Sequence, residues 1–147
     1  MRLVIAALAL CLAALPARAA DLVETPSPHS VAETVAKLTA AVEKAGAKVF
    51  ATIDHAAGAR SIDASLPDTV LVIFGNPRIG TPIIAASPSA GLDLPLRVLV
   101  RDDNGQTRLI YETPASMAAR HEVVGADESL AKMQGALTNL VAAAASE

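Results

Sequence analysis

Two stretches of the chain repeat apolar residues with the period of an α-helix. The first begins after Ser30, which forms a capping-box pattern with Glu33, and ends at Gly46. Its apolar stripe recurs at spacings of three and four residues: Val31, Val35, Leu38, Val42 and Ala45. Asp127 is expected to cap a second helix with six apolar residues on one side: Leu130, Met133, Leu137, Leu140, Val141 and Ala144. Two long amphipathic helices of this kind need an apolar surface to cover.

Other stretches have the pattern of β-strands. They alternate apolar and polar residues, or are apolar throughout as in a central strand, over residues 48–54, 70–74, 96–101 and 107–112. In the first of them the alternation places Val49, Ala51 and Ile53 on the core side. Asn104-Gly105 between the last two is the strongest short-range signal for a hairpin. One more short strand fits between residues 21 and 28.

Short helices are predicted between these strands. In Thr81-Pro82 and Thr113-Pro114 the threonine caps a helix and the proline takes its first position, where a missing N–H costs nothing. These helices are expected to run to about Ser87 and His121, and residues 55–64 form another. The resulting order is β-α-β-β-β-β-α with small helices inserted. It predicts an α+β fold in which two long helices cover one face of an antiparallel sheet.

The N-terminus has the features of a secretory signal peptide. Arg2 provides a positive charge, Leu3–Leu15 is uninterrupted and apolar, and Ala17-Arg18-Ala19 fits the small-x-small rule for cleavage. The apolar run is shorter than the roughly 20 residues that a membrane-spanning helix needs. We therefore expect residues 1–19 to be removed, leaving residues 20–147 as a single α+β domain in the periplasm or outside the cell, with no membrane attachment.

Cleavage changes the chemistry that is available. It removes Cys11, the one cysteine, so thiolate catalysis, disulfides and cysteine-bound metals are excluded from the mature chain. It also removes Arg2 and Arg18, so Lys and Arg fall from 12 to 10 against 15 acidic residues and the net charge changes from −3 to −5. Three aromatic residues remain: Phe50, Phe74 and Tyr111. An acidic domain with few stacking platforms is not expected to bind nucleic acid.

Three segments of the chain resemble one known family. They read "ETVAKLTAAVEKAGAKVFATIDHAAGA", "VLVIFGNPRIGTPIIAASPSAGLDLPLRVLV" and "ASMAARHEV". They are similar to the family called domain of unknown function 302, over about residues 31–124. The resemblance implies a β-α-β4-α topology like that of the TATA-box-binding protein, and homodimers. It implies no activity and no cofactor.

The segment "IFGNPRIGTP", Ile73–Pro82, is interpreted first as a turn. Turn chemistry explains Asn76-Pro77, and a positive φ before the Thr81 cap explains Gly80. The alternative is a small-anion site, because a helix N-terminus behind glycines offers free N–H groups. Arg78 is the residue that turn formation does not require.

Asp54 and His55 lie where a predicted strand becomes a helix. Asp54 is explained as a helix cap and His55 as the first helical residue. Alternatively, the positive end of the helix keeps His55 neutral and free to accept a hydrogen bond or bind a metal. A metal site would require His55 and His121 to converge with Asp54 or His29, and the sequence has no short-range ligand motif that ensures this.

The favoured site therefore combines five residues: Asp54, His55, Asn76, Arg78 and His121. Polar groups at strand ends and helix starts can meet at one end of a sheet. Two functions are compatible with such a site. The first is a non-catalytic module that binds a small ligand, such as an anion or a metal, or another protein. The alternative is an enzyme that uses His55 and His121 for acid–base or metal-assisted chemistry.

Overall fold

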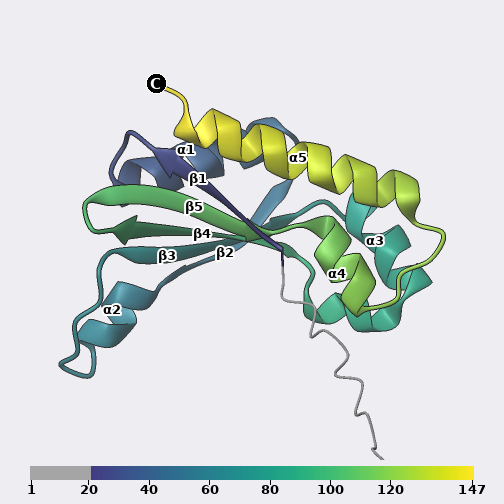
Figure 1. Ribbon diagram of the computed structural model, residues 1–147, viewed down its shortest axis with the longest axis horizontal. Coiled ribbons are helices and arrows are strands. Elements are labelled where there is room, and N and C mark those ends of the chain that lie inside the picture. The colour runs from purple at the N-terminus through teal and green to yellow at the C-terminus, as the bar shows by residue number, and fades with distance from the viewer. Residues whose placement is uncertain (1–20) are drawn as a thin grey trace, which may run out of the picture.

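A five-stranded antiparallel sheet lies beneath two long helices in the computed structural model, which describes residues 21–147 (Figure 1). The strands are β1 Leu22–Ser27, β2 Lys48–Asp54, β3 Thr69–Gly75, β4 Leu96–Asp103 and β5 Gln106–Glu112. The helices are α1 Val31–Lys44, α2 His55–Arg60, α3 Pro77–Ala86, the 3₁₀ helix η1 Pro88–Leu92, α4 Pro114–Arg120 and α5 Asp127–Ala145. The strand order is β1-β5-β4-β3-β2. The predicted α+β class is confirmed, and the predicted signal peptide lies outside the described residues.

Local signals set most element boundaries. Ser30 accepts a hydrogen bond from the backbone N–H of Glu33, whose carboxylate accepts one from the backbone N–H of Ser30, so the capping box is present. Gly46, just past α1, has φ of +72°. Asn104 and Gly105 have φ of +54° and +88°, as expected for the two central residues of a type I′ hairpin turn. One cap differs: Asp127 is the first residue of α5, and Ala126 precedes it without a side-chain cap.

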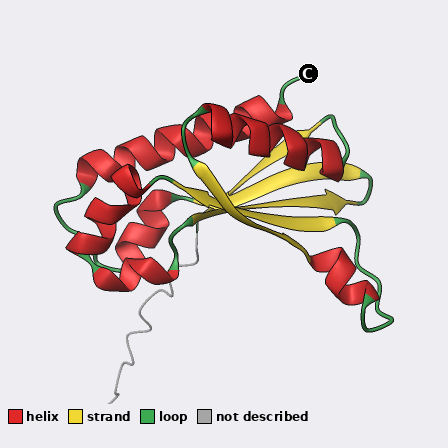
Figure 2. Cartoon of the chain, turned by 180° about the vertical axis from the view of Figure 1, so that it is seen from behind, coloured by secondary structure: helices red, strands yellow, loops and turns green. Residues whose placement is uncertain are grey.

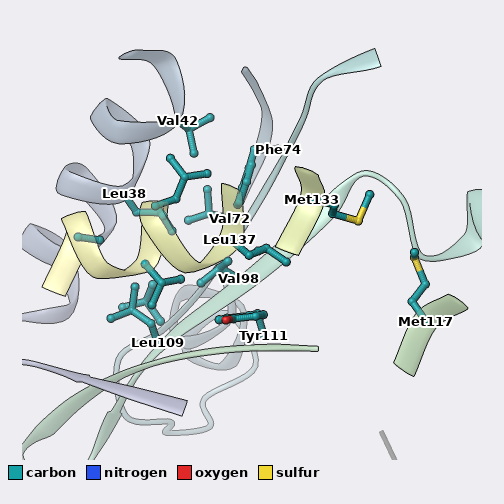
Figure 3. Close-up of a cluster of buried hydrophobic side chains, with 14 of the residues drawn as sticks. Leu38, Val42, Val72, Phe74, Val98, Leu109, Tyr111, Met117, Met133 and Leu137 are labelled. Carbon is teal, nitrogen blue, oxygen red and sulfur yellow. The ribbon is translucent and has the colours of Figure 1, made fainter. Parts of the chain in front are cut away.

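The core lies between one face of the sheet and the helices α1 and α5 (Figures 1 and 2). Leu38 from α1, Val72 from β3 and Leu137 from α5 are all 0% exposed. Figure 3 shows these side chains gathered between the sheet and the two helices. The predicted apolar stripes of both long helices therefore face the sheet, with Val35 and Leu130 half-buried, except that Ala45 follows α1 as its C-cap and is exposed.

The opposite face of the sheet carries apolar side chains that no long helix covers. Leu71, Ile73, Leu99 and Ile110 are half-buried and do not belong to the core cluster. They alternate along their strands with buried residues such as Val72 and Val98, which point to the helices. We refer to this side as the open face.

A bulge in β2 overturns part of the predicted alternation. Val49 pairs with Phe74, but Ala51 pairs with Ile73, so Phe50 is an extra residue in the ladder. A shift of one residue moves the rest of a strand to the other face. Ile53, expected in the core, is consequently 41% exposed.

The start of α3 also differs from the prediction. The helix begins at Pro77 rather than after Thr81, because Asn76 accepts a hydrogen bond from the backbone N–H of Arg78 at 3.0 Å and so caps it. Gly80 is a helical residue rather than a turn residue with positive φ. Pro82 lies inside the helix, where it removes one backbone hydrogen bond. The interpretation of this segment as a simple turn was wrong.

Candidate functional site

The structure does not bring the five predicted site residues together. In the β2–β3 ladder Asp54 pairs with Val70, whereas Lys48, six residues earlier, pairs with Gly75. At about 3.3 Å per residue, Asp54 lies roughly 20 Å from the strand end that leads into Asn76. Figures 1 and 2 show α2 at one end of the sheet and α3 and α4 at the other. The five residues therefore do not converge as predicted. Ligand binding by the residues at either end of the sheet stays a prediction.

At the α2 end, Asp54 acts as a helix cap. Its Oδ1 accepts a hydrogen bond from the backbone N–H of Ala57 at 2.8 Å, and its Oδ2 lies 3.5 Å from Arg60 Nη2. His55, the first residue of α2, is exposed. The structure thus accounts for the position of Asp54 by capping alone.

At the other end, His121 belongs to a polar cluster centred on Asp93. His121 Nε2 lies 2.6 Å from Asp93 Oδ2, and His121 Nδ1 lies 3.0 Å from Ser89 Oγ. The same carboxylate accepts hydrogen bonds from Arg97 at 2.6 Å and from Arg120 at 2.5 Å. We call Asp93, Arg97, Arg120 and His121 the Asp93 cluster.

Asp93 and His121, at the centre of the Asp93 cluster, are largely shielded from water, whereas the side chains of Arg97 and Arg120 are 45% and 43% exposed. The side chains of Asp93 and His121 are 14% and 7% exposed. Burial raises the pKa of Asp93, but the hydrogen bond from His121 and the charges of Arg120 and Arg97 outweigh it and hold that pKa below its ordinary value. Glu112 also pairs with Arg120, so two carboxylates face two guanidinium groups. The cluster joins the loop before β4 to the end of α4.

The histidines do not form a metal site. Among residues 21–147 there is no group of three or more His, Asp or Glu side chains placed to hold a metal ion. His55 and His121 are at opposite ends of the sheet, and His29 Nε2 instead lies 2.7 Å from the carbonyl oxygen of Ser146. The three histidines therefore do not converge.

An apolar pocket of about 270 Å³ lies where α3, α5 and the ends of β2 and β3 meet. Its walls include Phe50, Gly75, Ile84, Pro95, Met133 and Leu140. Asn76 and Thr81 are its two lining residues with polar side chains, and none of the lining residues is charged. Phe50 and Ile84 are 50% and 37% exposed, so solvent reaches the pocket past them. A concave site of this kind is suited to a small apolar ligand.

Gly75 allows close packing at one wall of the apolar pocket. A Cβ atom at this position would lie 3.3 Å from Pro95 Cβ and 3.6 Å from Phe50 Cε2. The bulge at Phe50 and the loop before β4 therefore approach the end of β3 closely. Pro95 in turn follows Asp93 by two residues, so the Asp93 cluster anchors the segment that contributes this wall.

Sequence reasoning identified parts of this region but not the pocket. It selected Asn76, which lines the pocket, and Arg78, which follows it on α3. It did not select Asp93, because nothing local links residue 93 to residues 120 and 121. The one available signal was the number of apolar residues around "FGNPRIGTP" and "LDLPL", which exceeds what a surface turn requires.

Comparisons with known proteins now add to this geometry. Residues 23–140 match the model of a family described as domain of unknown function DUF302. A crystal structure of an uncharacterized conserved DUF302 protein from Bacillus stearothermophilus is similar, with a TM-score of 0.77, over 84% of this chain and 97% of that one. At 15% sequence identity this likeness shows the fold.

Curated relatives include Fluoride-specific ion channel FluC 1 of Brucella suis and of Brucella abortus. Each is 43% identical over 103 residues, which is 69% of this chain but 41% and 38% of those proteins. The chain thus spans about two fifths of the length of these relatives. Within residues 21–147, none of the helices has the length and apolar character to cross a bilayer.

Proposed function

The chain belongs to the DUF302 family, and from the geometry of this member we propose that it is an exported, non-catalytic module that binds a small apolar ligand in the apolar pocket. The observation that carries the proposal is the pocket itself, a cavity of about 270 Å³ with no charged lining residue. The longer Brucella relatives are named as fluoride-specific ion channels, and we do not propose fluoride conduction for this chain.

The energetics favour a ligand of modest affinity. One water occupies about 30 Å³ of liquid, so the apolar pocket has room for roughly nine groups of that size. Burial of each CH₂ group contributes about 0.8 kcal/mol, and part of this is lost to ordering the ligand. We therefore expect dissociation constants between about 10 μM and 1 mM for chains of this size.

A large side chain inside the apolar pocket should strongly weaken ligand binding. Ala136 on α5 lines it, so the side chain of an Ala136→Phe variant would occupy the volume that the ligand needs. We expect this variant to bind the uncharged fluorophore 1-aminonaphthalene, which is small enough for the pocket, at least tenfold more weakly than the wild type, a loss of about 1.4 kcal/mol. Titration followed by fluorescence measures this directly.

Ala142→Phe is the matched control for this test. Ala142 is exposed on the same helix and does not line the apolar pocket. It should bind the fluorophore as the wild type does. Equal binding by the wild type and Ala136→Phe would contradict the proposed site.

Native mass spectrometry of the exported protein tests three further parts of the proposal together. We expect a chain that begins at Ala20, a homodimer as the family resemblance implies, and, when the fluorophore is added in excess over the expected dissociation constant, the added mass of bound fluorophore. Retention of Met1 would contradict export, and a spectrum of monomers alone would contradict the dimer. A spectrum without the added mass would contradict binding in the expected range.

The second candidate function is acid–base chemistry at His121, favoured by the chain of contacts Ser89–His121–Asp93. When neutral and protonated on Nε2, His121 can donate to Asp93 and accept from the Ser89 hydroxyl. His55, at the other end of the sheet, has no part in it. Mass spectrometry of a small ligand after incubation with the protein separates the two functions, because an enzyme would return a chemically altered ligand and a binding module an unchanged one.

A further inference from the structure

We propose that the ligand of the apolar pocket is an anionic amphiphile, an unbranched chain of about eight carbons whose carboxylate lies against Lys48. This inference rests on the proposed function and specifies the class of ligand. Two independent features support it, namely the position of Lys48 and the distribution of charge around the pocket.

Lys48 lies beside the pocket by the geometry of the sheet. Its Cα is the ladder partner of Gly75, which forms one wall. Its ammonium nitrogen is 5.6 Å from the centroid of the Phe50 ring, another part of the wall. This cation therefore lies over the rim at Phe50, within reach of a head group carried by a molecule in the apolar pocket.

The charge of Lys48 is available to such a head group. Within residues 21–147, Lys48 Nζ makes no ion pair and no hydrogen bond with a side chain or carbonyl, and the side chain is exposed. The face of the Phe50 ring attracts the ammonium group but does not neutralise its positive charge. No carboxylate is among the residues that line the apolar pocket, so nothing there repels an anion.

The size of the apolar pocket limits the length of the chain. Room for roughly nine water-sized groups is enough to bury an eight-carbon chain, whereas about half of the sixteen or eighteen carbons of a membrane lipid would stay in water outside the pocket. The walls are apolar except for Asn76 and Thr81, so the chain would lie inside and the carboxylate would stay at the rim. An ion pair between Lys48 and that carboxylate would be partly solvated, which limits its strength.

Competition between two probes tests this inference. Octanoate and 1-octanol have the same number of carbons, and each displaces 1-aminonaphthalene if it enters the apolar pocket. We expect Lys48→Gln to weaken octanoate binding roughly threefold to tenfold, as the loss of one partly exposed, charge-assisted hydrogen bond does. Binding of 1-octanol should be unchanged. In the wild type, 0.5 M sodium chloride should weaken octanoate alone, because salt screens the ion pair.

Arg60→Gln is the control for removing a positive charge. Arg60 is exposed on α2, at the opposite end of the sheet, so its loss should leave octanoate binding as in the wild type. Binding of the uncharged fluorophore by Lys48→Gln shows that this variant is folded. Its affinity for octanoate then reports on the contribution of the Lys48 charge.

The outcomes distinguish this inference from the proposed function. If the fluorophore binds the wild type, but octanoate binds the wild type and Lys48→Gln equally, the inference about Lys48 is overturned and the proposed apolar site stands. If octanoate fails to displace the bound fluorophore, the inference is likewise overturned and the proposed apolar site stands. A fluorophore that does not bind the wild type at all overturns the proposed function and this inference with it.

Discussion

Val72→Asp is expected to leave the domain unfolded. Val72 lies in the central part of β3, is 0% exposed, and belongs to the same core cluster as Leu38 and Leu137. The substitution removes about 1.5–3 kcal/mol of apolar burial and adds a carboxyl group without a partner, at a cost of several kcal/mol more. The sum is comparable with the whole stability of a domain, about 5–15 kcal/mol. Far-UV circular dichroism and urea titration at neutral pH will show whether a cooperative transition remains.

Leu71→Asp is the matched control, one residue away on the same strand. Leu71 is half-buried on the open face and outside the core cluster. This variant should stay folded and lose no more than about 2 kcal/mol, because the new carboxylate remains in contact with water. A folded Val72→Asp protein beside an unfolded Leu71→Asp protein would reverse the assignment of the two faces.

The second large effect is expected at Asp93. Asp93→Asn keeps the shape of the side chain and removes the charge that Arg97, Arg120 and His121 share. Losing one partner of a fully buried ion pair costs about 3–5 kcal/mol, but the two arginines are 45% and 43% exposed and can be rehydrated. We therefore expect a loss of about 2 kcal/mol in the free energy of unfolding at pH 7.

The effect of Asp93→Asn should depend on pH in a defined direction. The pKa of Asp93 in the folded protein lies below the ordinary value of 3.8, so folding favours the ionised carboxylate. The stabilisation is fully present above about pH 5 and is lost as the pH falls through 3.8 toward the lower pKa of the folded state. The difference in unfolding free energy between wild type and Asp93→Asn should therefore shrink between pH 5 and pH 3.

Asp68→Asn provides the comparison for this series. Asp68 is exposed, and its carbonyl oxygen, not its carboxylate, accepts a hydrogen bond from the backbone N–H of Asp102. This variant should follow the wild type at every pH. A constant difference between wild type and Asp93→Asn from pH 7 to pH 3 would show that the charge of Asp93 does not stabilise the fold.

Local sequence was sufficient for the elements whose signals lie within a few residues. The capping box at Ser30, the left-handed Gly46 and the Asn104-Gly105 hairpin each involve neighbours in the chain, and the structure has all three. The apolar stripes of α1 and α5 were also readable, because a helix covering a sheet must repeat its apolar residues every three or four positions. From these parts the α+β class followed.

The boundaries of β2 and α3 were decided by packing. A bulge at Phe50 is invisible in an alternating sequence, since it depends on how β2 pairs with β3. Two cap-like pairs lie five residues apart: Asn76-Pro77, which was interpreted as a turn, and Thr81-Pro82, which predicted the start of the helix. The earlier one prevails, and the fully buried Ile83 shows that tertiary contacts hold a helix containing Pro82 in place.

Tertiary structure alone decided which candidate residues share a region. Sequence located Asp54, His55, Asn76, Arg78 and His121 at strand ends and helix termini, but an antiparallel strand has two ends, and the chain order does not say which ends coincide. The register of β2 against β3 puts Asp54 and His55 at one end of the sheet and Asn76 at the other. The apolar pocket and the Asp93 cluster arise only where segments far apart in the sequence meet, because their physical basis is contact between distant parts of the chain.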